Sequence, residues 1–241
     1  MILEPQWHVY GLLITIIASV HLWSAWFEFR TRHHRKMWIG IIGGISLGYV
    51  CLYMLPKLSA AASHINLMFP DSGFTSKYLA YYILLGSILL FLGMEKASEY
   101  HKNGAIASRW LHMNSHGLYC FLIGYVAVEL PLPKISLHVL ANVILAAHLL
   151  GMIIHLRENF PGVHDHRTRW LFSALVVAGS LMGIMTQLPV LFIMMATSFV
   201  AGFILVNVIA DELPRRGEGE LHWFLMGAGL FGVTIIFLQP G

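Results

Sequence analysis

Hydrophobic residues occur along this sequence in long runs, separated by short segments that hold most of the charged residues. An α-helix needs about 20 mostly apolar residues to cross the hydrocarbon core of a bilayer. Eight runs approach or reach this length, and the connections between them leave almost no chain for another domain. We therefore expect a single transmembrane domain over residues 1–241, an all-α integral membrane protein with helices at residues 7–27, 37–56, 79–95, 111–130, 136–156, 170–187, 189–210 and 221–238.

The composition agrees with this membrane class. Of the 241 residues, 57% are hydrophobic and only 11% are charged, whereas soluble domains carry roughly 25% charged residues. No Lys or Arg precedes the first hydrophobic run. That run therefore lacks the basic segment of a cleavable signal peptide, and we expect it to be retained as a helix.

Basic residues are distributed unequally between the two sides of the predicted helices. If the eight helices alternate in direction, 12 of the 15 Lys and Arg residues fall on one side, and Lys57, Lys77 and Lys134 fall on the other. Cytoplasmic loops collect positive charge, so both termini are expected outside, in a plasma membrane or a bacterial inner membrane. The net charge of +3 is then a signal of topology. Membrane lipids are the expected surroundings, and no nucleic-acid partner is expected.

A segment near the start of the chain is similar to one near its end. Residues 43–57 and 201–215 align without gaps and share five identities, among them a Leu-Pro pair. Two unrelated Leu-rich helices that each end at a proline would match about as well, and this alternative stays open. If the match is a repeat, its two copies cross the membrane in opposite directions, as in secondary transporters with a site at the repeat interface. The repeats would cover residues 7–95 and 170–238, with the two helices of residues 111–156 between them.

Histidines are concentrated in these two middle helices. His112, His116 and Cys120 are spaced four residues apart on one face of the first, and His148 and His155 share one face of the second. A short connection makes the two helices antiparallel neighbours, so the histidines are expected to meet at paired depths. Neutral imidazoles from facing helices can bind Zn, Ni, Cu or Fe. The alternative for each histidine is a hydrogen bond across a helix interface.

A metal site is therefore predicted at His112, His116, His148 and His155. Other side chains are candidates for the path of the ion because they carry oxygen, nitrogen or sulfur near the same helices or at the cytoplasmic exit. These candidates are His21, Met113, Cys120, Met152, Asn207, Asp211 and Glu212.

Several motifs resemble those of the ZIP family of divalent metal transporters, over essentially the whole chain. The segment from Gly43-Gly44 to Tyr53-Met54-Leu55-Pro56-Lys57 is similar to a Gly-Gly run that ends in His-Leu-Leu-Pro-Glu, and Glu95-Lys96 is similar to the pair that closes the third helix. His112-Met113-Asn114-Ser115-His116-Gly117 resembles the pattern His-Asn-x-x-Asp-Gly of the fourth helix. In the fifth helix, His148 matches the first residue of the pattern His-Glu-x-Pro-His-Glu.

The resemblance implies eight helices in a 3 + 2 + 3 arrangement with inverted outer repeats, and transport of a divalent metal ion. Zinc is the first expected substrate, with Fe, Mn, Ni and Cu as alternatives. The carboxylates of the family patterns are absent from the matched positions of the fourth and fifth helices. An altered, His-based site follows, in which Met113, Met152 or Cys120 would favour a softer metal.

The alternative function is a non-transporting protein on the same fold that binds or senses a metal, or a haem held by His116 and His148. The sequence contains no phosphate loop, nucleophile elbow or zincin motif. We therefore expect no catalytic residues and no enzymatic activity. A homodimer is left open.

Overall fold

A computed structural model describes residues 7–68, 74–100, 105–129, 135–159, 166–186, 188–213 and 221–238. This part of the chain is nearly all helical, as predicted. Its helices are α1 (Trp7–Thr31), α2 (Arg35–Tyr49), α3 (Leu55–Met68), α4 (Phe74–Tyr100), α5 (Ala105–Glu129), α6 (Ile135–Asn159), α7 (His166–Met185), α8 (Val190–Asn207) and α9 (Leu221–Leu238), with a 3₁₀ turn η1 (Arg32–His34) and two π-helices, η2 (Val50–Met54) and η4 (Val208–Glu212).

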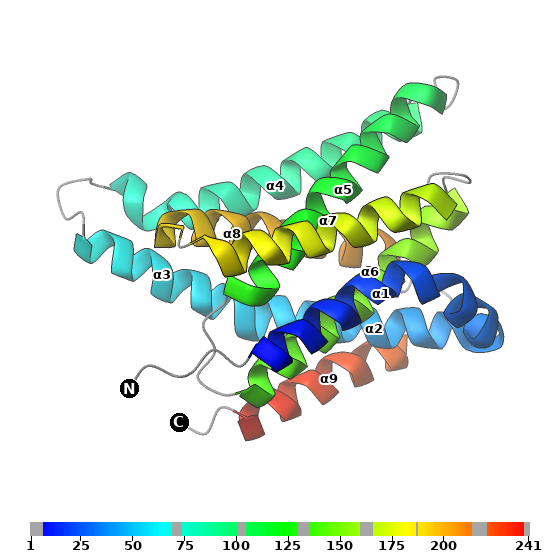
Figure 1. The fold of residues 1–241 in the computed structure, drawn as a ribbon, viewed down its shortest axis with the longest axis horizontal. Helices are drawn as coiled ribbons and strands as arrows, with labels where there is room; N and C mark the ends of the chain where they lie inside the picture. Colours follow the sequence, from blue (N-terminus) through cyan, green and yellow to red (C-terminus); the bar gives the residue numbers. More distant parts are fainter. Residues whose placement is uncertain are drawn as a thin grey trace.

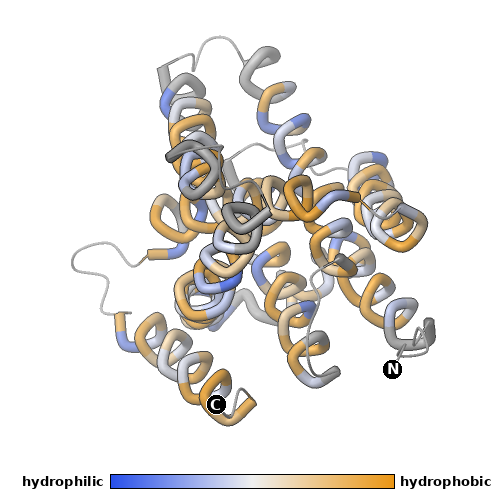
Figure 2. The backbone as a smooth tube through the Cα atoms, turned by 90° about the vertical axis from the view of Figure 1, so that its left-hand side faces the viewer, coloured by the Kyte–Doolittle hydropathy of each residue, from blue (hydrophilic) through white to orange (hydrophobic). Residues whose placement is uncertain are grey.

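The helices α2, η2 and α3 follow one another without a break, so the described chain forms eight helical rods. Successive rods run in opposite directions, and α1 begins on the same side of the bundle on which α9 ends (Figure 1). Hydrophobic residues predominate in every rod when the bundle is viewed roughly along its helices (Figure 2). The alternating directions of the rods are those that the count of basic residues assumed, and which side is cytoplasmic stays a prediction.

The surface of the bundle is apolar, as expected of a membrane protein. Large hydrophobic side chains point outward on many helices, for example Trp23 at 63% exposure, Leu225 at 60% and Phe237 at 79%. A soluble protein rarely exposes contiguous apolar surface of this kind. Within the described residues, five helical segments are long and apolar enough to cross a membrane. Two further helices, α4 and α6, have shorter apolar cores at Tyr78–Met94 and Val139–Ile154. The chain is therefore membrane-embedded, and the full set of eight spans stays a prediction.

Glycines allow two pairs of helices to pack with their backbones in contact. A Cβ atom added at Gly124 of α5 or Gly179 of α7 would overlap a backbone carbonyl of the other helix. Gly44 of α2 and Gly227 of α9 do the same for the second pair. Small residues at such contacts are a common way for membrane helices to associate, because lipid provides no hydrophobic force between them.

The helix contacts of the first predicted repeat are similar to those of the second. In this comparison α1, α2–α3 and α4 correspond to α7, α8 and α9, and α5 corresponds to α6. The extensive contact of α5 with α7 has its counterpart in α6 with α1, and the contact of α2 with α9 has its counterpart in α4 with α8. The middle helix α5 contacts α7 and α8 more than it contacts α6, and α6 contacts α1 and α2 more than it contacts α5. The sequence predicted that they would be antiparallel neighbours, and they are in contact, but each packs mainly on outer helices.

The two π-helices lie at equivalent positions of the aligned segments. Residues 50–54 and 208–212 occupy the same places in the gap-free alignment of residues 43–57 with 201–215. Each π-helix closes with a bond over five residues, from the N–H of Leu55 to the carbonyl of Val50 and from the N–H of Leu213 to that of Val208. π-Helices are rare in proteins. Their coincidence is therefore a strong structural similarity between the two segments.

The second helix does not end at Pro56, as the sequence suggested, but continues as α3 to Met68. A proline in a helix clashes with the carbonyl four residues before it and lacks an N–H donor. The wider turn of η2 lies directly before Pro56, where that clash would fall. After η4 the chain behaves differently, because Leu213, which precedes a proline in the sequence, is extended at φ −73° and ψ 124°.

Candidate metal centre

Three potential metal ligands meet where α1, α5 and α7 come together. His21 comes from α1, and His116 and Cys120 come from successive turns of α5. Their ligand atoms lie within 4.8 Å of one another, and Cys120 Sγ is 3.3 Å from Nε2 of His21. All three side chains are buried, with exposed fractions of 0% for His21, 3% for His116 and 0% for Cys120. Imidazole and thiol groups at this separation are a donor set for a transition metal.

An aromatic side chain fixes the two imidazole rings. The rings of His21 and His116 stand edge to face, with centroids 5.4 Å apart and an angle of 84° between their planes. Phe172 of α7 contacts both, at 4.4 Å from His116 and 5.5 Å from His21. The hydroxyl of Ser173 donates a hydrogen bond of 2.8 Å to the carbonyl of Ala18, which ties α7 to α1 beside the site. The ligand side chains are therefore held by packing and by the backbone.

The distances are compatible with a bound ion. A metal at about 2.3 Å from sulfur and about 2.0–2.1 Å from imidazole nitrogen would see Cys120 Sγ and His21 Nε2 at an angle of about 100°, given their 3.3 Å separation. That angle is close to tetrahedral. The same separation also suits a hydrogen bond between the thiol and the imidazole, which gives both groups a partner when no ion is present.

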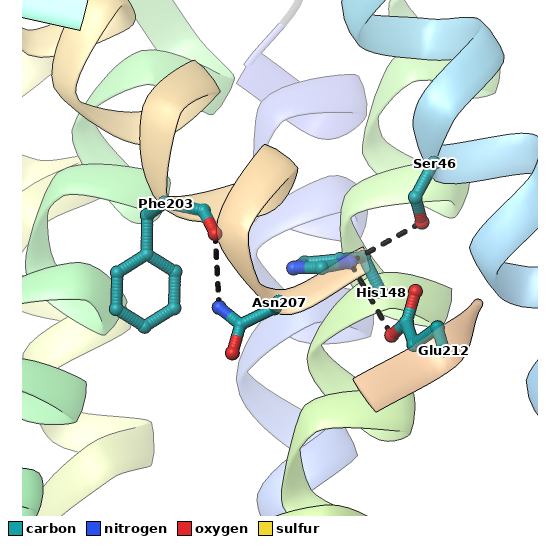
Figure 3. A network of polar contacts seen from close by, with 5 residues as sticks. All are labelled: Ser46, His148, Phe203, Asn207 and Glu212. Atoms are coloured by element: carbon teal, nitrogen blue, oxygen red, sulfur yellow. Dashed lines mark hydrogen bonds and ion pairs between the residues drawn. The ribbon is translucent and has the colours of Figure 1, made fainter. Parts of the chain in front are cut away.

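A second buried polar group surrounds His148 of α6. Its Nδ1 atom lies 3.2 Å from Oγ of Ser46 on α2 and 3.7 Å from Oε1 of Glu212, the last residue of η4 (Figure 3). Asn207 lies on the other side of the imidazole ring and donates a hydrogen bond of 3.0 Å to the carbonyl of Phe203. His148 is 0% exposed and Glu212 is 4% exposed. We call Ser46, His148, Glu212 and Tyr119, whose ring lies 6.1 Å from that of His148, the His148 cluster.

The carboxylate of Glu212 fits against two glycines. A Cβ at Gly151 of α6 would lie 2.8 Å from Oε1 of Glu212, and one at Gly43 of α2 would lie 2.7 Å from its Cβ. Any larger residue at these positions would displace the acid. The sequence analysis placed Glu212 at a water-exposed helix end and expected no carboxylate among the central histidines. The structure instead makes Glu212 the one acidic side chain that is buried in the described part of the chain.

Tyrosine hydroxyls extend the His148 cluster. The ring of Tyr119 is edge-on to His148 at 6.1 Å, and the rings of Tyr49 and Tyr53 stack at 5.3 Å. Among the residues that the structure describes, these three hydroxyls and Nε2 of His148 are buried without a hydrogen-bond partner. Leaving a buried polar atom unsatisfied costs about 1–3 kcal/mol. Two of these atoms, the Tyr119 hydroxyl and Nε2 of His148, lie in one cluster and indicate a place that receives water or a polar ligand.

The structure divides the predicted metal residues between the two sites. The structure places His116 with His21 and Cys120, both of which were predicted for the path of the ion. His148 belongs to the other cluster. His116 and His148, whose pairing the haem alternative needs, therefore fall in different groups. His112 is half-buried one turn from His116.

The remaining predicted residues have less specific surroundings. Met113 and Met152 pack in the hydrophobic core, and Asn207 bonds its own helix. The side chains of His155 and Asp211 lie outside the described part of the structure.

Four residues of the two sites were not predicted from the sequence: Ser46, Tyr49, Tyr119 and Phe172. A signal for Ser46 and Tyr49 was present, because Ser46, Tyr49 and Tyr53 recur every three to four residues and so share a face of the second helix. Phe172 and Tyr119 carry no such signal, since aromatic residues are common on every membrane helix.

Comparisons with family models, with curated proteins and with solved structures yield no match for this chain. The resemblance to ZIP transporters therefore rests on the motifs and their order along the sequence.

Proposed function

We propose that this protein is a membrane transporter of transition-metal ions, built like a ZIP transporter, with His21, His116 and Cys120 as a metal-binding station. The observation that carries the proposal is this buried His-His-Cys group at the junction of three helices in a membrane bundle. Polar and ionisable residues are expensive inside a bilayer and usually serve a function there. A single buried histidine is readily explained by helix packing. Three buried side chains whose ligand atoms lie within 4.8 Å of one another support a shared role in metal binding.

A route for the ion supports transport over simple binding. Tyr119 directly precedes Cys120 in the chain, and its ring contacts His148, so the metal station and the His148 cluster are adjacent. The cluster offers an imidazole nitrogen, which binds the same class of ions, beside a carboxylate and a hydroxyl oxygen. Two polar stations in sequence are what an ion needs to cross a low-dielectric interior.

The symmetry of the fold supports an alternating-access mechanism. Paired π-helices and matched helix contacts are the features expected of two inverted repeats. In this proposal the helices α1–α4 and α7–α9 form the outer repeats of a 3 + 2 + 3 arrangement, and α5 and α6 carry ligands between them. Rocking of one repeat against the other would open the station to each side in turn.

Uptake into proteoliposomes tests the proposal. Vesicles that contain the purified protein and an internal metal-sensitive dye are exposed to Zn²⁺, Co²⁺, Fe²⁺, Mn²⁺, Ni²⁺ or Cu⁺. We expect at least one ion to accumulate above the level in empty vesicles, and His116→Ala and Cys120→Ser to remove most of that uptake. Cys51→Ser and His222→Ala are matched controls because both side chains are exposed.

The outcomes separate transport from binding. Stoichiometric metal binding that depends on Cys120, without uptake of any ion, would replace the transporter by a metal-binding or sensing protein. If neither uptake nor binding changes in the two site variants, the assignment of the site is wrong.

A further inference from the structure

We propose that the His21–His116–Cys120 group is matched to a monovalent, thiophilic ion, Cu(I), in preference to a divalent one. The inference rests on the proposed metal station and concerns which class of ion it takes. It departs from the zinc-first expectation that the family resemblance carries.

The ligand atoms of the group are few and soft, which favours Cu(I). The group offers two imidazole nitrogens and one sulfur, and no carboxylate of the described residues belongs to it. Thiolate sulfur selects Cu(I) and Zn²⁺, and imidazole binds both metals, so the number of donors distinguishes the two ions. Cu(I) is satisfied by about three ligands of this kind, whereas structural Zn²⁺ sites almost always have four.

The charge of the ligands also matches a monovalent ion. Cysteine binds metals as the thiolate, so two neutral imidazoles and one thiolate contribute a single negative charge. Cu(I) brings that charge to zero, while a divalent ion leaves one uncompensated positive charge at side chains that are at most 3% exposed. An unpaired charge in such surroundings is strongly unfavourable. The buried acid of the described chain, Glu212, lies 3.7 Å from His148 and is not a member of the group.

The wall of the site is apolar where a fourth ligand would have to enter. Phe172 packs against both imidazoles, at centroid distances of 4.4 Å and 5.5 Å. Zn²⁺ or Co²⁺ would need a fourth ligand, and a water molecule in that role would have to replace apolar contacts of this kind. A three-coordinate ion keeps the packing as it is.

Competition for metal tests the inference on the purified full-length protein in detergent, under a reductant that keeps copper monovalent. Bicinchoninate serves as the competing chelator for Cu(I), and 4-(2-pyridylazo)resorcinol for Zn²⁺. We expect one Cu(I) per chain and much weaker binding of Zn²⁺. Cys120→Ser should weaken Cu(I) binding by more than the roughly 10–100-fold that loss of an outer-shell partner costs. Cys51→Ser, at an exposed cysteine, should leave it unchanged.

The possible results distinguish this inference from the proposed function. If Zn²⁺ binds as tightly as Cu(I) and is lost in Cys120→Ser, the preference for a monovalent ion is wrong and the metal station stands. If neither ion binds, or binding persists in both Cys120→Ser and His116→Gln, the station itself is wrong. X-ray absorption of the copper-loaded wild type provides a measurement that needs no variant. Three ligands, two nitrogen and one sulfur, are expected, and a four-coordinate copper would overturn the inference.

Discussion

The close contact between α5 and α7 makes Gly179 a test of how the fold supports the site. A Cβ at Gly179 would overlap the carbonyl oxygen of Phe121 on α5. Because unbonded heavy atoms settle at about 3.5–4.0 Å, Gly179→Ala must push the two helices apart by on the order of 1 Å. Overpacking of this kind costs about 1–3 kcal/mol, which lowers the ratio of folded to unfolded protein by about fivefold to on the order of a hundredfold. The same movement separates His116 on α5 from Phe172 on α7, so metal affinity should fall as well.

Unfolding in mixed micelles with increasing fractions of SDS, followed by tryptophan fluorescence, measures this loss. Gly86→Ala is the matched control, because a Cβ at Gly86 meets nothing within 4 Å. Its free energy of unfolding should stay within about 0.5 kcal/mol of the wild type. The reasoning is refuted if Gly179→Ala and Gly86→Ala unfold at the same SDS fraction.

Three further predictions concern the His148 cluster and the topology. Tyr119→Phe removes a buried hydroxyl that has no hydrogen-bond partner among the described residues. The SDS fraction at which half of the protein is unfolded should therefore rise or stay constant, while metal uptake falls. A large loss of stability would show that the hydroxyl has a structural partner. Glu212→Gln keeps the size of the side chain and replaces the carboxyl group beside His148 by a neutral amide. Metal uptake should fall at least about tenfold, a loss of about 1.4 kcal/mol. Metal binding by His21, His116 and Cys120 should be retained. Gly151→Ala should reproduce this defect, because its Cβ would lie 2.8 Å from the Glu212 carboxylate; wild-type uptake in both variants would remove Glu212 from the route. A fluorescent reporter that matures only in the cytoplasm, fused after Gly241, should stay dark in a bacterial host, and a bright fusion would reverse the predicted orientation.

The helical framework was readable from the sequence because it depends on local patterns. Runs of apolar residues predict membrane helices whatever their neighbours are, and the alternating basic residues predict their directions. The segment that ends at Pro56 shows the limit of such patterns. A proline usually stops a helix, but the π-helix Val50–Met54 allows this one to continue to Met68.

The site was only partly predictable because it depends on how helices pack. The spacing of His116 and Cys120 places both on one face of a helix, and the structure brings them together. Their partner His21 lies on α1, 99 residues before Cys120 in the sequence. Helical periodicity relates residues within one helix, so it cannot reveal a contact between helices that are so far apart along the chain.

Glu212 illustrates a second cause of error. A π-helix bonds over five residues, so η4 turns Glu212 toward the side of Asn207 and His148 (Figure 3). Regular α-helical periodicity would have placed Glu212 elsewhere, and the two glycines that receive it come from other helices.

The most direct test of the central claim is X-ray diffraction from metal-loaded crystals at the absorption edge of the bound metal. The account predicts an anomalous peak about 2.0–2.3 Å from Nε2 or Nδ1 of His21 and His116 and from Sγ of Cys120. A peak only between His148 and Glu212, or no peak in protein that binds metal stoichiometrically in solution, would contradict it.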